Sequence, residues 1–325
     1  MKASHSISRR CLVASALAFA ALPALAEEAW PSKPITFIQP YAPGGTSDVL
    51  ARLIGAHLQK RLGQSIVVDS KSGAGGNIGT DYVAKAKPDG YTFLVSSSGP
   101  IVISGALYPR LPYKPESDLT PISPLARAPF VLAVNAKAPL TSVGEVIAKG
   151  KTGMLNFGSA GSGSPQHIIG EMFNVAAGTK MQHIPYKGSG PLLNDLVGGQ
   201  VALAFENPLP LMPQVKAGNI RVLAVTSGQR AKAFPNIPTL AEAGVPGFDA
   251  VPWYGMFGPK GLSPEIASKL NAEVQAVLML PEVRARLEEL GAEAFPQPID
   301  AFRGLIAADI KKWSAAVKES GATVD

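Results

Sequence analysis

Two glycine-rich turns carry the residues with the clearest chemical potential in this chain. The first turn covers residues 41–48 (YAPGGTSD), and the second covers residues 159–164 (SAGSGS). Each follows an apolar, strand-like segment and precedes a helical pattern. A helix that begins at such a turn directs unpaired backbone N–H groups, and the positive end of its dipole, at the turn. Both turns are therefore predicted to be seats for an anion.

Small hydroxyl side chains accompany both turns. Thr46 and Ser47 lie in the first turn, and Ser159, Ser162 and Ser164 lie in the second. Hydroxyl and backbone N–H groups together can hold a carboxylate without a fixed positive charge. The competing interpretation is that the glycines only permit tight turns. Asp48 is equally open to two interpretations, ligand contact or a favourable charge in the first turn of a helix.

Further polar side chains are expected at the same edge of the sheets. Ser97 and Glu206 follow predicted buried strands, and Tyr186 follows another predicted strand. His167 comes shortly after the second turn and could reach a cleft there. Open α/β sheets bind ligands at the carboxyl ends of their strands. A carboxylate at Glu206 would favour a ligand with an amine or hydroxyl, although Glu206 can equally be a satisfied loop residue.

Spacing argues against several other chemistries. The segment 73–79 (GAGGNIG) resembles a dinucleotide fingerprint, but its third glycine falls one place late. The sequence contains no GxxxxGK[ST] phosphate loop. The histidines beyond residue 26, His57, His167 and His183, show no metal-ligand spacing. We therefore expect no cofactor and no metal.

A secreted serine hydrolase is the alternative function. The 159–164 run has the glycine and serine content of a nucleophile elbow, but no serine in it has glycine at both −2 and +2. The single cysteine, Cys11, lies near the N-terminus, so a thiol nucleophile is also disfavoured. We assign no catalytic residue and favour a binding protein over an enzyme.

The first 26 residues have the pattern of an export signal. Lys2, Arg9 and Arg10 precede the apolar segment 11–22, and Ala24-Leu25-Ala26 is a small-x-small cleavage site. We expect cleavage after Ala26 and a periplasmic location. The adjacent arginines leave the choice between Sec and twin-arginine export open.

Charge argues against a nucleic-acid partner. The formal net charge is +6, and loss of the three basic residues of the signal would leave +3. The remaining basic residues are scattered singly and do not form a patch interleaved with aromatic residues. An acidic small molecule would suit this weakly basic protein.

Strand-like apolar runs alternate with amphipathic helical stretches, which predicts an α/β fold with mostly parallel sheets flanked by helices. Ser164 is a predicted helix N-cap, with Pro165 as the first helical residue, and Gly178 is the predicted helix end. The segments 109–129 and 235–252 are rich in proline and break the pattern, and the chain is expected to be helical after the second break.

These two breaks enclose a middle segment inserted into an outer one. We expect domain 1 to comprise residues 27–127 and 251–325, and domain 2 to comprise residues 128–250. Such an insertion leaves two crossover strands between the domains, and this pair forms a hinge.

The ordered motifs resemble one known family, the substrate-binding receptors of tripartite tricarboxylate transporters (Bug-type periplasmic proteins). The resemblance extends from about residue 30 to residue 325. Its motifs are WPSKPI (30–35), PGGTSD (43–48), GAGGNIG (73–79), KPDGYT (87–92), LPY (111–113), PYKG (185–188), GGQV (198–201), KAG (216–218), AVTS (224–227) and PTLAEAG (238–244).

The resemblance implies a two-domain Venus-flytrap fold that holds a ligand carboxylate between two loops. It assigns binding roles to Tyr41, Gly45, Thr46, Asp48, Ser159 and Ser164. We add Ser97, Ala160, Gly163, His167, Tyr186 and Glu206 as candidate ligand contacts. The implied partners are a small organic acid and the membrane subunits of a tripartite transporter or, in some members, a signalling protein. We expect a monomer.

Two positions depart from the family pattern. Ala202 replaces an aspartate that commonly follows GGQV, and Glu206 stands where aspartate is common. The second departure lies near the end of the site that discriminates between ligands. It leaves di- and tricarboxylates, aromatic acids and amino acids open as ligands, with His167 and Trp253 as further candidates for specificity.

Overall fold

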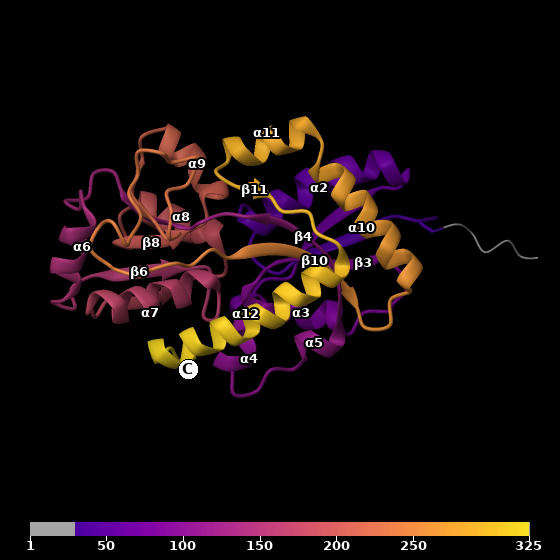
Figure 1. The fold of residues 1–325 in the computed structure, drawn as a ribbon, viewed down its shortest axis with the longest axis horizontal. Helices are drawn as coiled ribbons and strands as arrows, with labels where there is room; N and C mark the ends of the chain where they lie inside the picture. The colour runs from indigo at the N-terminus through magenta and orange to yellow at the C-terminus, as the bar shows by residue number, and fades with distance from the viewer. Residues whose placement is uncertain (1–29, 325) are drawn as a thin grey trace, which may run out of the picture.

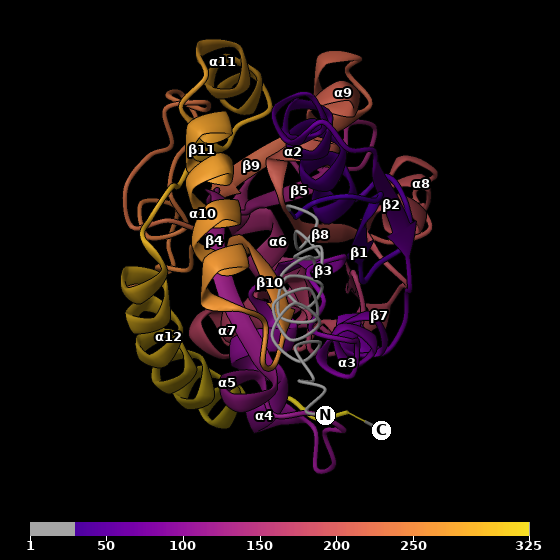
Figure 2. The same cartoon turned by 90° about the vertical axis from the view of Figure 1, so that its right-hand side faces the viewer.

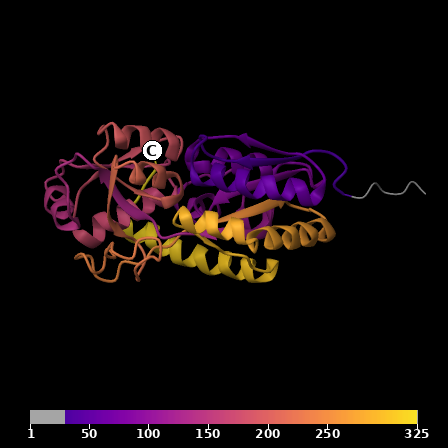
Figure 3. The same ribbon diagram turned by 90° about the horizontal axis from the view of Figure 1, so that it is seen from above.

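The computed structural model describes residues 30–324, which form two lobes lying end to end (Figures 1 and 3). The predicted signal peptide, residues 1–26, lies outside the described residues. Each lobe is built around one sheet with helices on its faces. None of the helices between residues 30 and 324 is long and apolar enough to cross a membrane.

The first lobe contains a six-stranded sheet in the order β11-β4-β10-β3-β1-β2. Its strands are β1 (Ile35–Gln39), β2 (Ile66–Ser70), β3 (Thr92–Ser97), β4 (Leu119–Arg127), β10 (Trp253–Pro259) and β11 (Glu293–Ala294). The helices of this part are α2 (Thr46–Leu62), α3 (Asn77–Ala84), α4 (Ser104–Leu107), α5 (Pro115–Asp118), α10 (Pro264–Leu278), α11 (Pro281–Glu289) and α12 (Ile299–Ser320), with short turns η1 (Ala74–Gly76) and η2 (Gly99–Ile103).

The second lobe contains a five-stranded sheet in the order β7-β6-β8-β5-β9. Its strands are β5 (Val131–Asn135), β6 (Asn156–Ser159), β7 (Gln182–Pro185), β8 (Leu203–Glu206) and β9 (Ile220–Val225). Its helices are α6 (Val143–Gly150), α7 (Pro165–Ala177), α8 (Ser189–Val197) and α9 (Pro208–Lys216). The predicted N-cap at Ser164 and the predicted end of α7 at Gly178 are confirmed.

Local sequence explains the helices that matter for the site. In α2, Leu50, Ile54 and Leu58 recur at helical spacing and are fully buried. The helix ends at Gly63, which adopts the left-handed conformation (φ 67°) that glycine tolerates best. The apolar face of α2 therefore fixes its N-terminus at the end of β1, next to the other lobe.

The α/β class and the two-lobed architecture match the prediction, but the sheets are mixed and not mostly parallel. β1 pairs in parallel with β2 and β3, whereas β10 pairs antiparallel with β3 and β4. In the other sheet, β5 pairs antiparallel with β8 and β9. β5 and β10 are the first strands after each crossing between lobes, so they enter their sheets from the opposite end.

The lobes are joined by the two crossings and by α12. The chain crosses between β4 and β5 and again between β9 and β10. α12 begins beside the first lobe and ends against α7 of the second (Figure 1). Figure 2 shows α10 and α12 on one side of the molecule and α3 and α8 on the other.

Candidate ligand-binding cleft

A small cavity lies where the two lobes meet, and most of the side chains that line it carry a hydroxyl or amide group. The first lobe contributes Tyr41, Gly45, Thr46, Ser47, Ser97 and Tyr254, and the second contributes Ala160, Gln166 and Ser189. The cavity volume is about 10 Å³, which is room for about one water molecule. The lobes therefore lie closed on each other, and a larger solute needs them to separate.

Direct hydrogen bonds between the lobes accompany this closure. The backbone N–H of Ala42 donates to the carbonyl of Lys187 over 2.8 Å. The hydroxyl of Tyr108 donates to the carbonyl of Ser162 over 2.7 Å. Gly75 lies so close to Ser162 that a Cβ there would come within 1.9 Å of that carbonyl oxygen, which only a residue without a side chain permits.

The N-terminus of α2 presents free donors to the cavity. Gly45 is the N-cap and no side chain caps the first turn. The hydroxyl oxygens of Thr46 and Ser47 are buried and have no hydrogen-bond partner among residues 30–324. Leaving buried polar groups unpaired costs free energy. These groups therefore form a seat that an anionic oxygen would complete.

Tyr41 and Ser97 extend this seat along the first lobe. The hydroxyl of Tyr41 lies 2.6 Å from Ser97 Oγ and donates to the carbonyl of Gly75 over 3.2 Å. Burial raises the pKa of Tyr41 and also that of Tyr254 well above the usual tyrosine value. Both phenols are therefore neutral at physiological pH and act as hydrogen-bond donors or acceptors.

The N-terminus of α7 is already satisfied by its own segment. Ser164 Oγ caps the helix by accepting from the His167 N–H over 3.4 Å. The N–H of Gly163 donates to His167 Nδ1 over 3.2 Å, and the N–H of Gly161 donates to Ser159 Oγ over 3.1 Å. Pro165, at the first helical position, has no N–H to offer.

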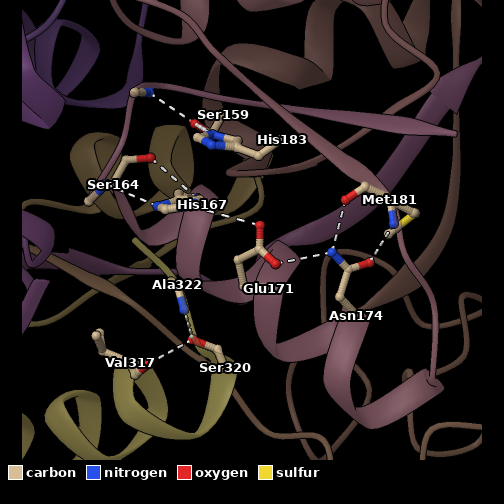
Figure 4. Close-up of polar contacts among 12 residues, drawn as sticks. Ser159, Ser164, His167, Glu171, Asn174, Met181, His183, Val317, Ser320 and Ala322 are labelled. Atoms are coloured by element: carbon tan, nitrogen blue, oxygen red, sulfur yellow. Dashed lines mark hydrogen bonds and ion pairs between the residues drawn. The ribbon is translucent and has the colours of Figure 1, made fainter. Parts of the chain in front are cut away.

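Two stacked histidines lie behind this second turn (Figure 4). The rings of His167 and His183 are 3.9 Å apart between centroids and 19° from parallel. Burial lowers the pKa of His167 to about 4. Burial and the neighbouring His167 lower the pKa of His183 to about 3. Both imidazoles are therefore neutral near pH 7, and they position the turn without adding charge.

The contact between Ser159 and His183 bears on the hydrolase alternative. Ser159 Oγ lies 2.6 Å from His183 Nε2, but Ser159 is fully buried. No carboxylate hydrogen-bonds to His183 within residues 30–324, so the third member of a triad is missing from that part of the chain. A general base also works best with a pKa near the operating pH, far above that of His183. The contact between Ser159 and His183 is therefore suited to a structural role in the interior and not to nucleophilic catalysis.

Glu206 lies directly behind the lining of the cavity. It ends β8 and is fully buried. Its Oε1 accepts from Gln166 Nε2 over 3.1 Å and from the Asn207 N–H over 2.7 Å. Its Oε2 has no partner among the described residues. Burial raises the pKa of Glu206 to about 7, although these hydrogen bonds partly oppose the increase.

The structure brings some of the sequence-predicted residues to the cavity and places others behind it. Tyr41, Gly45, Thr46, Ser97 and Ala160 line the cavity. Ser159, Gly163, Ser164, His167 and Glu206 belong to the layers that support the lining.

Asp48 and Tyr186 make other contacts. Asp48 accepts from the Gly44 N–H over 3.1 Å and from Arg52 over 2.9 Å, so it organises the first turn. The Tyr186 hydroxyl donates to Asp195 over 2.8 Å. Neither side chain lines the cavity.

Sequence reasoning named the Ser47 hydroxyl as part of the first turn but missed Gln166, Ser189 and Tyr254 as lining residues. Ser47 and Gln166 each lie at the second position of a helix that begins at a glycine turn, which was a usable signal. Ser189 opens α8 and carried a weaker signal of the same kind. Tyr254 belongs to β10, a strand that the sequence analysis did not predict.

Among residues 30–324, no three His, Cys, Asp or Glu side chains are grouped to hold a metal ion. A groove of about 520 Å³ lies beside the crossings, with Arg127, Pro129 and Val251 in its wall. Its charged walls bear both signs, and none of the predicted site residues lines it.

Solved structures place this arrangement in the class of two-lobed periplasmic binding proteins. The structure of periplasmic binding protein BugD has a TM-score of 0.87 and 32% sequence identity, and the match covers 90% of this chain and 99% of that one. Rpa4515 of R. palustris, solved with adipate, has a TM-score of 0.87 and 38% identity over 91% of this chain and 100% of that one.

The chain belongs to the family of tripartite tricarboxylate transporter receptors, whose family model matches residues 50–322. A related protein, BugT of Bordetella pertussis, is 41% identical over 298 residues, which is 91% of each chain. MatC (Rpa3494) of Rhodopseudomonas palustris, solved with bound malate, has a TM-score of 0.84 and 34% identity over 89% of this chain and 100% of that one.

Proposed function

We propose that this protein is a periplasmic receptor that captures a small organic carboxylate between its two lobes and delivers it to a tripartite transporter. The observation that carries the proposal is the N-terminus of α2, where N–H groups and the hydroxyls of Thr46 and Ser47, none of them capped or paired by a side chain of residues 30–324, face an inter-lobe cavity. This arrangement suits a carboxylate oxygen. The family membership and the relatives solved with adipate and malate support the same class of ligand.

The proposed domain boundaries follow the sheets. Domain 1 comprises residues 27–127 and 251–325, and domain 2 comprises residues 128–250. In support, each strand of the six-stranded sheet lies in the first set and each strand of the five-stranded sheet lies in the second. Ligand entry then requires rotation about the crossings, and closure would rebuild the contacts of Ala42 and Tyr108.

The proposed site has two layers. Tyr41, Gly45, Thr46, Ser97 and Ala160 contact the ligand directly, together with Ser47, Gln166, Ser189 and Tyr254. Asp48, Ser159, Gly163, Ser164 and His167 act by positioning the two turns, and Tyr186 acts by holding α8 through Asp195. In this proposal the exported protein is a monomer, released by cleavage after Ala26, and its loaded form is recognised by membrane subunits.

A thermal-unfolding screen of residues 27–325 tests the proposal. Mono-, di- and tricarboxylates, aromatic acids and amino acids are compared with sugars and amines at pH 7.5. A ligand present at a hundred times its Kd should stabilise the native state by about 2.7 kcal/mol. We expect one class of acid to raise the unfolding temperature. Stabilisation by neutral or cationic solutes, with none by any acid, would contradict the proposal.

Two additional measurements address the finer claims. Sedimentation in the absence and presence of the best acid should give the mass of one chain throughout. The N-terminal sequence of protein recovered from the periplasm should begin at Glu27. A dimer would contradict the monomer proposal, and a different first residue would contradict the cleavage site.

A further inference from the structure

One buried carboxylate lies directly behind the lining of the cavity, and among residues 30–324 no cationic side chain pairs with it. Glu206 ends β8 and hydrogen-bonds through Oε1 to Gln166, which lines the cavity. Its other oxygen, Oε2, is buried and has no partner within residues 30–324. A buried carboxylate oxygen of this kind is unfavourable unless something donates a hydrogen bond to it.

The groups around Glu206 do not neutralise it. The titratable groups that sense its charge are Tyr41, after β1, and Tyr254, on β10, and burial raises the pKa of both phenols so that they stay neutral. From α7 and α8 it faces only the neutral side chains Gln166 and Ser189. No lysine, arginine or histidine lines the described cavity. The cavity therefore combines neutral hydrogen-bonding groups in its lining with a carboxylate directly behind that lining.

We propose that Glu206 makes this receptor select acids that carry one carboxylate and an uncharged or cationic hydrogen-bond donor at the other end, and disfavour dianions. This inference rests on the proposed function. The α2 N-terminus holds the carboxylate of the ligand. A hydroxyl, amide or ammonium at its far end donates to Glu206 Oε2, whereas a second carboxylate is repelled by it.

The protonation of Glu206 makes the selection depend on pH. Burial raises the pKa of Glu206 to about 7, so it is mostly ionised at pH 8 and mostly protonated at pH 6. A protonated Glu206 repels a second carboxylate less and can donate a hydrogen bond to it. Binding of a dianion should therefore strengthen as the pH falls and should take up a proton, whereas binding of a cationic far end should weaken.

The test compares diacids with their monoamides, which differ only in the charge and donors of one end. The pairs are succinate and succinamate, glutarate and glutaramate, adipate and adipamate, and terephthalate and 4-carbamoylbenzoate. Kd is measured by calorimetry at pH 8 for the wild-type protein and Glu206→Gln. Glu171→Gln is the matched control, because Glu171 contacts Asn174 and His167, and neither of these lines the cavity.

In the wild-type protein, we expect the monoamide of the best pair to bind at least about tenfold more tightly than its diacid. Glu206→Gln should reduce this ratio about tenfold or more, and Glu171→Gln should leave it unchanged. Between pH 8 and pH 6, diacid binding should strengthen in the wild-type protein and in Glu171→Gln but not in Glu206→Gln. Unfolding curves of the ligand-free variants establish that each is folded, and Glu206→Asp, which keeps the charge, should retain the wild-type preference if Glu206→Gln is unfolded.

A monoamide that binds no better than its diacid in the wild-type protein overturns this inference, and so does a ratio that survives Glu206→Gln. Either result is compatible with carboxylate capture, so the proposed function would stand. If no acid binds to the wild-type protein at all, the proposed function fails, and this inference fails with it.

Discussion

The two glycine turns look alike in sequence, yet their helices begin differently. At the N-terminus of α2, Gly45 offers no side-chain cap, and the hydroxyls of Thr46 and Ser47 have no partner among the described residues. At the N-terminus of α7, Ser164 caps the helix. In addition, His167 Nδ1 accepts the N–H of Gly163. The first turn keeps its donors for the cavity, whereas the second uses most of them to hold its own shape.

This difference shows that the helix N-terminus alone does not define an anion seat. An anion can bind only if the backbone N–H groups of the first helical turn are not already hydrogen-bonded to a capping side chain. The second turn still contributes Ala160 and, two residues after the cap, Gln166 to the cavity wall. We therefore infer that the α2 turn supplies most of the affinity for a carboxylate, and that the α7 turn supplies a rigid opposing surface.

The largest expected effect is on the first turn. The double variant Thr46→Val/Ser47→Ala removes two donors, and hydrogen bonds to charged groups contribute about 1.5–3 kcal/mol each. The Kd for the best acid should increase about a hundredfold or more by calorimetry. The ligand-free protein should unfold at or above the wild-type temperature, because neither hydroxyl has a hydrogen-bond partner among the described residues. An unchanged Kd would contradict the leading role of this turn.

The second effect is on stability and comes from the histidines behind the α7 turn. The pKa values of His167 and His183, about 4 and 3, lie below the unfolded value of about 6.5. Unfolding therefore takes up protons below pH 6.5, and stability is lost as the pH falls from 6.5 toward 4.

Thermal unfolding from pH 7 to pH 4 measures this loss for the wild-type protein and for His183→Phe. The unfolding temperature of the wild-type protein should fall by several degrees. His183→Phe keeps an aromatic ring on His167 and should fall less, with His57→Gln, on a helix remote from the pair, as the control. Equal curves for His183→Phe and the wild-type protein would exclude His183 as a source of the acid sensitivity.

Loss of the α7 cap should have a smaller effect. Ser164→Ala removes the acceptor for the His167 N–H, and loss of an N-cap costs about 1 kcal/mol. For a protein of about 300 residues the unfolding temperature should fall by about 1–2 °C. The Kd of the best acid should change less than about threefold. A loss of affinity larger than that of Thr46→Val/Ser47→Ala would reverse the comparison between the turns.

The smallest effect should come from Arg52→Ala, in α2 next to the first turn. Arg52 pairs with Asp48, but its side chain is 58% exposed, and exposed pairs of this kind contribute about 0.5 kcal/mol or less. Unfolding and Kd should both stay close to the wild-type values. A substantial loss of affinity would instead mean that the charge on Asp48 or Arg52 acts on the ligand.

Much of the fold could be predicted because local signals agree with it. β2, α2 and α7, together with the glycine ends of both helices, follow from periodicity and capping. β4 and β10 could not be predicted in this way. β4 contains Pro121 and Pro124, which usually argue against a central strand. Register shifts in its pairing with β10 accommodate them.

The site was predictable to the level of its turns and not to the level of each side chain. The strand ends and glycine patterns located Thr46 and Ser97, and the family resemblance added Tyr41 and led to Ala160. They did not show that Asp48 turns back to Gly44, because that choice depends on geometry within the turn. They also did not reveal Tyr254. This residue reaches the cavity because the chain returns from the second lobe and forms β10 in the sheet of the first lobe.

The long helix α12 contacts elements of both lobes, so we expect its contact with α7 to favour the closed form even without a ligand. It belongs to the C-terminal part of the chain but ends against α7, where Ala316 shares a surface depression with Met172 and Val175. Opening that moves α7 away from α12 must slide or break this contact. The population of closed, empty receptor is therefore set partly by a surface outside the cleft. A solute can enter only when the lobes are apart, so the apparent affinity depends on how much of the empty receptor is open. Substitutions at the contact between α7 and α12 should therefore change the affinity without touching any ligand atom.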